Sequence, residues 1–191
     1  MTNPVLHHAN LKTRRLDEMI AWYEVVAGLS VVFRWSGGAF LTNDGANHRL
    51  ALLSSPALSD DPDKLVHTGI HHLAFEFPEL DDLLEAYVRL AGAGIDPHFT
   101  VDHGMTTSFY YPDPDGNSVE LQVDNFGDWT RSTEFMRSAP EFEADPIGTL
   151  VDPRQMIRDR EAGASPAEIH ERGYAGRYTP AAPMDIRMPL G

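Results

Sequence analysis

The sequence predicts an α+β fold in which two tandem βαβββ modules, about residues 4–56 and 69–124, are followed by a C-terminal extension. Three observations support this prediction. The order of strand, helix and three strands occurs twice along the chain. Half of the prolines, seven of 14, fall after residue 124. A shift of 64 residues superimposes four pairs of like residues: His8 and His72, Leu16 and Leu80, Tyr23 and Tyr87, Gly28 and Gly92.

The composition is that of a globular protein of one domain with an extension. Of the 191 residues, 42% are hydrophobic and 23% are charged. No apolar run reaches the roughly 20 residues that cross a bilayer, and the N-terminus lacks an apolar signal core. The net charge of −14 repels phosphate backbones and anionic lipid, which argues against nucleic-acid and membrane partners. The absence of cysteine excludes disulfides and thiolate chemistry, and we expect a cytoplasmic location.

The first module begins with an alternating segment, VLHHANLKT, which predicts a strand over residues 5–13. Residues 14–27 repeat apolar side chains at helical spacing, with Asp17 and Glu18 in the first turn, where the helix dipole favours acids. Gly28 is a suitable helix end. Strands are then predicted over residues 29–35, 38–43 and 49–55, because glycine-containing turns separate these apolar runs.

The second module repeats this order. The segment GIHHLAFEF predicts a strand over residues 69–77, and leucines at helical spacing predict a helix over residues 79–93. Strands are predicted over residues 98–103, 105–112 and 117–123, with the turn PDPDGN before the last of them. Residues 1–124 are therefore expected to form one domain.

The C-terminal extension, residues 125–191, contains two predicted short helices, over residues 153–161 and 166–173. Ser165 and Pro166 form a typical helix start. Several large apolar residues precede them: Phe126, Trp129, Phe135, Met136 and Phe142. We therefore expect the extension to pack on the domain or on a neighbouring subunit rather than to be disordered.

Three residues on three predicted strands form a candidate metal site: His8, His72 and Glu120. Two imidazoles and one carboxylate suit Fe(II) and leave positions open for substrate and oxygen. A single strand histidine is more often structural than a ligand, but two doublets at equivalent places in a repeat favour the metal hypothesis. A carboxylate on an otherwise apolar strand favours it too, because a buried unpaired charge costs several kcal/mol.

These residues resemble the vicinal oxygen chelate superfamily, which includes glyoxalase I, epimerases, bleomycin-resistance proteins and type I extradiol dioxygenases. The resemblance covers residues 4–124 and rests on LHHANLKT…LDEMIAWYEVVAGL, GIHHLAFEF and DHGMTTSFYYPDPDGNSVEL. It implies an open metal-binding β cup. Glyoxalases and epimerases commonly take a fourth ligand from the last strand of the first module, where Leu50 and Ala51 cannot bind metal. The chain is most similar to one-domain extradiol dioxygenases of the 2,3-dihydroxybiphenyl type.

The resemblance implies a function: oxidative cleavage of a catechol-type aromatic diol by Fe(II), or by Mn(II), with O₂ as co-substrate. It also implies roles for His48 in NHRLAL, for Tyr110 ten residues before Glu120, and for an acid that is either His103 or His98, with His103 the better local match. In the alternative interpretation, His48 lies in a surface turn, Tyr110 belongs to the core and His98 is merely exposed. Other metal-dependent isomerases or lyases of this superfamily, and a non-catalytic protein that binds aromatic ligands, remain alternatives. A homodimer or a higher homo-oligomer is expected.

Overall fold

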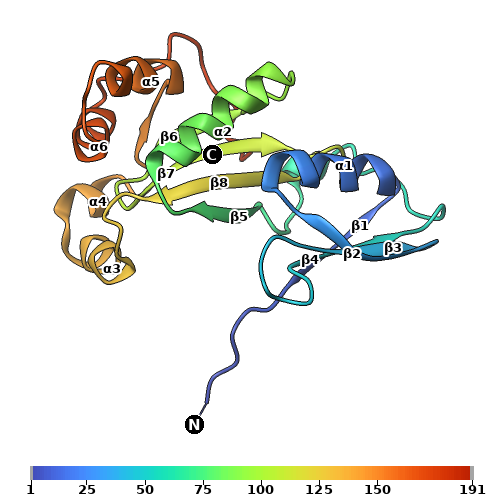
Figure 1. The fold of residues 1–191 in the computed structure, drawn as a ribbon. Helices are drawn as coiled ribbons and strands as arrows, with labels where there is room; N and C mark the ends of the chain where they lie inside the picture. The colour runs from blue at the N-terminus through green and yellow to red at the C-terminus, as the bar shows by residue number, and fades with distance from the viewer. Residues whose placement is uncertain (1, 190–191) are drawn as a thin grey trace. The chain divides into compact units, whose positions relative to one another are not determined.

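The computed structural model describes residues 2–189 and divides into two compact units (Figure 1). The first unit comprises the chain up to His67 together with the turn Asp113–Asn117. The second unit comprises Thr68–Pro112 and the chain from Ser118 onward. Each unit contains one βαβββ module, so the predicted repeat is confirmed.

The first unit is a four-stranded sheet with one helix across it (Figure 1). The strand order is β1-β4-β3-β2, with β1 and β4 parallel and the other pairs antiparallel. One apolar face of α1 is buried against the sheet, where Leu41, Leu50 and Leu52 are fully covered. The elements are β1 (Ala9–Thr13), α1 (Leu16–Ala27), β2 (Ser30–Trp35), β3 (Gly38–Thr42), β4 (Leu50–Ser54) and the 3₁₀ helix η1 (Lys64–Val66).

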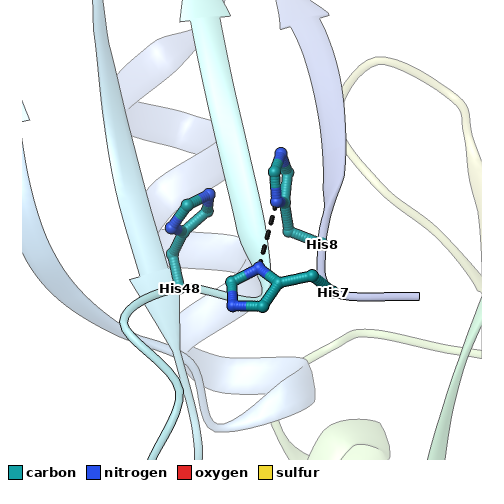
Figure 2. A group of neighbouring side chains, drawn as sticks. All are labelled: His7, His8 and His48. Atoms are coloured by element: carbon teal, nitrogen blue, oxygen red, sulfur yellow. Dashed lines mark hydrogen bonds between the residues drawn. The ribbon is translucent and has the colours of Figure 1, made fainter. Parts of the chain in front are cut away.

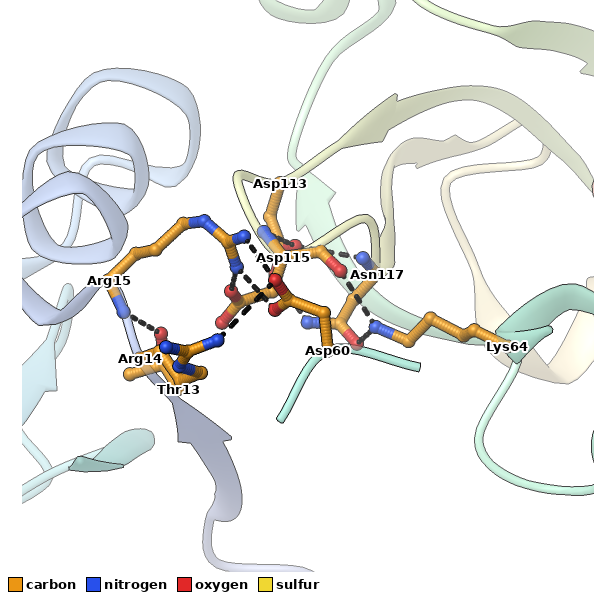
Figure 3. A network of polar contacts seen from close by, with 8 residues as sticks. All are labelled: Thr13, Arg14, Arg15, Asp60, Lys64, Asp113, Asp115 and Asn117. Carbon is orange, nitrogen blue, oxygen red and sulfur yellow. Dashed lines mark hydrogen bonds and ion pairs between the residues drawn. The ribbon is translucent and has the colours of Figure 1, made fainter. Parts of the chain in front are cut away.

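A polar network attaches the turn 113–117 to the other residues of the first unit (Figure 3). The guanidinium of Arg15 donates to the carboxylates of Asp60 and Asp115, over 2.7 and 2.6 Å respectively. The ammonium of Lys64 donates to the carbonyl of Asp115 and to the amide oxygen of Asn117, over 2.9 and 2.6 Å. These contacts hold the turn 113–117 by charge-assisted hydrogen bonds.

The second unit repeats the sheet and adds a fifth strand. The order is β5-β8-β7-β6-β9, in which β5 and β8 are parallel, and α2 lies across one face (Figure 1). Leu83, Leu84 and Leu90 of α2 are buried, as the helical spacing predicts. The elements of this module are β5 (His72–Phe77), α2 (Leu80–Gly92), β6 (Phe99–Asp102), β7 (Thr106–Pro112) and β8 (Ser118–Asp124).

Residues of the C-terminal extension pack within the second unit. Strand β9 (Thr149–Leu150) pairs antiparallel with β6 and covers that edge of the sheet. Buried side chains, Val151, Met156 and Ile169, attach the following helices. The two predicted helices are present as α5 (Pro153–Glu161) and α6 (Pro166–Tyr174), and α6 begins with a capping box at Ser165. Helices α3 (Trp129–Ser138) and α4 (Pro140–Ala144) were not predicted.

The first strand is shorter than predicted. It begins at Ala9, so His7 and His8 precede β1 and are exposed. The strand pairs β4 only from Ala9 onward, because Leu50 is the first residue of that partner strand. Within residues 2–189, no helix is long and apolar enough to span a membrane.

Candidate active site

Four residues paired in register form a row across the sheet of the second unit, and two of them have polar side chains. Ala74 pairs with Glu120, Glu120 with Tyr110, and Tyr110 with Phe99. Residues paired in register point to the same face of a sheet, and His72, two residues before Ala74, shares that face. The alternation predicted for His72 and Glu120 therefore places both on one face.

Glu120 is held by two of these neighbours. Its side chain is buried, with Oε2 3.1 Å from Nε2 of His72, and its Oε1 accepts the Tyr110 hydroxyl over 2.9 Å. Burial alone would raise the pKa of Glu120, but hydrogen bonds from His72, Ser108 and Tyr110 outweigh burial and lower it. Burial and the Glu120 charge raise the pKa of Tyr110, so the phenol stays protonated. This part of the site therefore combines an ionised carboxylate with a neutral phenol.

His103 contacts Tyr110 from the turn after β6. Its Nε2 lies 2.9 Å from the Tyr110 hydroxyl, and its Nδ1 lies 2.5 Å from the carbonyl oxygen of Ile147. Since a carbonyl oxygen only accepts, Nδ1 carries the hydrogen of the neutral ring and Nε2 presents a lone pair. Burial lowers the pKa of His103, which favours that neutral ring.

His98 lies near the same tyrosine but has different partners. Its Nδ1 lies 2.7 Å from the carbonyl oxygen of Asp185, and its Nε2 lies 2.9 Å from the hydroxyl of Ser118. Burial lowers the pKa of His98. Both ring nitrogens are thus engaged by groups outside the Tyr110–Glu120 pair, whereas His103 contacts Tyr110 directly.

The two histidine doublets have the same internal geometry. In the second unit Nδ1 of His72 lies 2.9 Å from Nδ1 of His71, and in the first unit Nδ1 of His8 lies 3.2 Å from Nδ1 of His7. In the second unit, Nε2 of His72 also contacts Glu120. His71 is exposed. Its Nε2 faces the carbonyl oxygen of Ile186 at 3.1 Å.

The equivalent row in the first unit lacks the acid and the phenol. There Asn10 pairs with Ala51, Ala51 with Phe40, and Phe40 with Phe33. Ala51 thus occupies the place of Glu120, and Phe40 the place of Tyr110. As expected from the sequence, this strand offers no carboxylate ligand.

His48 and His8 lie together in the first unit, with His7 beside them (Figure 2). The ring centroids of His8 and His48 are 4.3 Å apart. One nitrogen from each of the three rings lies within 4.8 Å of the others, so this set has the spacing of metal ligands. His48 loses basicity, because burial and then the neighbouring His8 and His7 lower its pKa. No role was predicted for His7 from the sequence.

Aromatic side chains continue from His48 across the sheet of the first unit. The Phe40 ring stacks on His48 at 4.7 Å, and Trp35 lies 5.1 Å from Phe40. Phe33 stacks on Trp35 at 5.9 Å and is more than half exposed. This aromatic row, Phe33, Trp35 and Phe40, offers flat apolar surface for another aromatic ring.

Sequence reasoning missed the contribution of the C-terminal extension to the site. The carbonyls of Ile147, Asp185 and Ile186 contact His103, His98 and His71. Backbone carbonyls occur in every residue and leave no trace in a sequence. The apolar residues of the extension predicted only that it packs on the domain or on a neighbouring subunit.

Comparison with known proteins agrees with this geometry. The profile of the Glyoxalase/Bleomycin resistance protein/Dioxygenase superfamily matches residues 5–121. The chain is 41% identical over 173 residues to biphenyl-2,3-diol 1,2-dioxygenase 3 of Rhodococcus globerulus, covering 90% of each chain. It is 39% identical over 180 residues to biphenyl-2,3-diol 1,2-dioxygenase 2 of the same organism, covering 94% of each chain.

Solved structures support the fold. A glyoxylase/bleomycin resistance protein/dioxygenase domain from Frankia is similar with a TM-score of 0.55 at 21% identity. That match covers 64% of this chain and 93% of the Frankia chain. The order of strands, the repeated module and the matched sequence lead to one conclusion: the chain belongs to the Glyoxalase/Bleomycin resistance protein/Dioxygenase superfamily.

Proposed function

We propose that this protein is an Fe(II)-dependent extradiol dioxygenase that opens the ring of a catechol-type aromatic diol, with a bicyclic diol such as 2,3-dihydroxybiphenyl as the preferred class. The observation that carries the proposal is the buried Glu120 carboxylate between His72 and Tyr110. The names of the two Rhodococcus globerulus relatives, which match nearly the whole chain, support the same activity. Ala51, in the place of Glu120, supports a three-ligand site over the four-ligand sites of other superfamily members.

The residues of the second unit fit a divalent metal. Nε2 of His72 and Oε2 of Glu120 are 3.1 Å apart. Two ligands at about 2.1 Å from a metal, about 90° apart, would be separated by about 3.0 Å. Nδ1 of His72 has its own partner in His71, as the second nitrogen of a metal-binding histidine usually does. We propose His72 and Glu120 as ligands, with His8 as the third.

A bound divalent metal would supply Lewis acidity, which makes a coordinated hydroxyl easier to deprotonate. The other chemistry belongs to the side chains. The Tyr110 hydroxyl can hydrogen-bond a substrate oxygen or donate to Glu120, and it keeps its proton because its pKa is raised by burial. Nε2 of His103 can take a proton and return it, because the neutral ring leaves that nitrogen bare. We propose His103 rather than His98 for this role, since both nitrogens of His98 have other partners.

The first unit supports the substrate part of the proposal. His48 would hold or move a proton beside His8, in keeping with its lowered pKa. The aromatic row of this unit, taken by itself, is an apolar surface of the kind on which aromatic rings stack. A neutral diol is also compatible with a net charge of −14.

Oxygen uptake tests the proposal directly. The full-length chain is loaded with Fe(II) anaerobically and mixed with aerated 2,3-dihydroxybiphenyl or catechol, while absorbance is followed for a yellow ring-opened product. We expect one O₂ consumed for each diol, with faster turnover of the bicyclic compound. Glu120→Gln serves as the control, because an amide is a poor replacement for the carboxylate ligand. A wild-type chain that retains iron but consumes no oxygen with either diol would overturn the proposal.

A further inference from the structure

Three histidines of the second unit each face a backbone carbonyl of the C-terminal extension. The contacts are Nδ1 of His103 to Ile147 at 2.5 Å, Nδ1 of His98 to Asp185 at 2.7 Å, and Nε2 of His71 to Ile186 at 3.1 Å. Because a carbonyl oxygen accepts and never donates, each contact selects the ring nitrogen that carries hydrogen. A neutral imidazole has one such hydrogen, so its second nitrogen is fixed as an acceptor.

We propose that the C-terminal extension is a positioning element of the active site, which fixes the ring orientation and the N–H position of His71, His98 and His103. The catalytic consequence rests on the proposed dioxygenase function, whereas the hydrogen-bond assignment does not. For His103 the selected tautomer leaves Nε2 bare toward Tyr110, 2.9 Å away. For His98 it leaves Nε2 to accept from the hydroxyl of Ser118.

The contact of Ile186 reaches His72 through His71. With hydrogen on its Nε2, His71 presents an unprotonated Nδ1, which lies 2.9 Å from Nδ1 of His72. That contact is a hydrogen bond only if Nδ1 of His72 carries the hydrogen. The carbonyl of Ile186 thereby influences the ring orientation of His72 through His71.

Apolar packing holds this part of the extension in place. Leu150, Met184 and Ile186 pack against the buried cluster of Phe99, Val101 and Tyr110. The sulfur of Met184 also lies 3.3 Å from the backbone nitrogen of Thr100, a residue of β6. Met184 directly precedes Asp185 and Ile186, whose carbonyls make two of the contacts. Loss of the anchor should therefore release both contacts together.

A separate anchor holds the carbonyl of Ile147. A side chain at Gly148 would place Cβ 2.2 Å from the carbonyl oxygen of Asp102, and the φ of Gly148 is +88°. Only glycine allows this approach without strain. Asp102 is fully buried and its carboxylate also binds His170 of α6, 2.8 Å away. The extension is therefore attached directly beside His103.

The test compares two methionines of the same segment. Met184→Ala removes a packed anchor, while Met188→Ala removes the same side chain four residues later, where it is 58% exposed. Histidine nitrogen–proton NMR correlations are recorded on the full-length ¹⁵N-labelled chain, with and without Zn(II). Signals are assigned by their loss in His71→Gln, His98→Gln and His103→Gln.

We expect the wild type to carry hydrogen on Nδ1 of His98 and His103 and on Nε2 of His71. Met184→Ala should give averaged tautomers at His71 and His98 and leave His103 unchanged. Met188→Ala should alter none of them. Gly148→Ala provides the reciprocal variant, because it should alter the tautomer of His103 and leave that of His98 unchanged. If Met184→Ala does not fold, Gly148→Ala alone tests whether the extension fixes these histidines.

Turnover gives a second readout. With the diol that the wild type cleaves, kcat of Met184→Ala and Gly148→Ala should fall by about ten- to a hundredfold, while KM changes little and Met188→Ala matches the wild type. Hydrogen on Nε2 of His98 or His103 in the wild type would overturn the inference, as would equal effects of Met184→Ala and Met188→Ala. A wild type without turnover contradicts the proposed function alone, since the NMR result still decides whether the extension fixes the histidines.

Discussion

Tyr110 and Glu120 face each other as a register pair of β7 and β8, and the tyrosine hydroxyl donates to the carboxylate over 2.9 Å. The bond occupies Oε1 of Glu120, while Oε2 points to His72. Each carboxylate oxygen thus has its own partner, the Tyr110 hydroxyl for Oε1 and the His72 ring for Oε2. The phenol has a single hydrogen, which it can donate either to Glu120 or to the bare Nε2 of His103, 2.9 Å away, so the hydroxyl lies between a proposed metal ligand and a proposed proton carrier.

Removal of this hydroxyl should slow turnover without loss of metal. We expect Tyr110→Phe to lower kcat by about a hundredfold, because His103 and Glu120 both lose their shared partner. Oxygen uptake and iron content are measured together. The matched control is Tyr111→Phe, whose hydroxyl is buried without a hydrogen-bond partner among the described residues. That change should keep the rate and raise the free energy of unfolding by about 1 kcal/mol. Equal rates for both variants would mean that Tyr110 is only a core residue.

Metal retention should depend on His72. Loss of a neighbour that merely orients a ligand weakens metal binding about 10- to 100-fold, so we expect His72→Ala to weaken it at least about 100-fold. Metal content after gel filtration and a metal titration measure this. His67→Ala is the control, because His67 is exposed and pairs with Asp61 instead. Full iron content in His72→Ala would contradict the ligand assignment.

The histidine cluster of the first unit gives a sharper test of ligand identity. If His8 is the third ligand of the proposed site, His8→Ala should lose iron, whereas His7→Ala should retain it. If the three clustered histidines bind a metal by themselves, both variants should lose it to a similar extent. We expect the first pattern, because His8 repeats His72 at the shift that relates the modules. Iron content of the two purified variants, side by side, distinguishes these outcomes.

An ion pair of the extension should make stability depend on pH. The Arg160 guanidinium donates to Asp81 over 2.6 Å, and this hydrogen bond lowers the pKa of the carboxyl. A lowered pKa contributes stability above the ordinary value of about 3.8, and that contribution is lost as pH falls through the folded-state value. Because the pair is partly exposed, Asp81→Asn should cost about 0.5 kcal/mol at neutral pH and less at an acidic pH below the ordinary value of the carboxyl. Urea unfolding at the two pH values measures the difference. A loss that is equal at both would exclude the pair as its cause.

The fold followed from the sequence because local and repeated signals agreed. Apolar spacing predicted both helices of the modules to within two residues at each end. The repeat predicted the shared strand order, since each module must bury the same face of its helix. The start of β1 was misplaced, because VLHH has strand propensity but no partner strand beside it.

The site was only partly accessible to the same reasoning. Spacing identified His72, Tyr110 and Glu120, which lie on one face because residues on adjacent strands are in register. Spacing could not choose between His98 and His103, since they flank the same strand, β6. The carbonyl partner of His98 lies 87 residues later in the chain, and that of His103 lies 44 residues later. Such contacts depend on the path of the extension.

The row of paired residues in the second unit and the equivalent row in the first unit differ in the chemical groups that a substitution can remove. In the row of the second unit, a change at Glu120 or Tyr110 removes a carboxylate or a hydroxyl. In the row of the first unit, Ala51 and Phe40 stand at the same two places and carry no charge and no hydroxyl. Side chains there can change in size and shape without removing a polar group. The two modules thus share one pattern of strand pairing, but a substitution at these paired positions removes a charge or a hydroxyl in the second unit only.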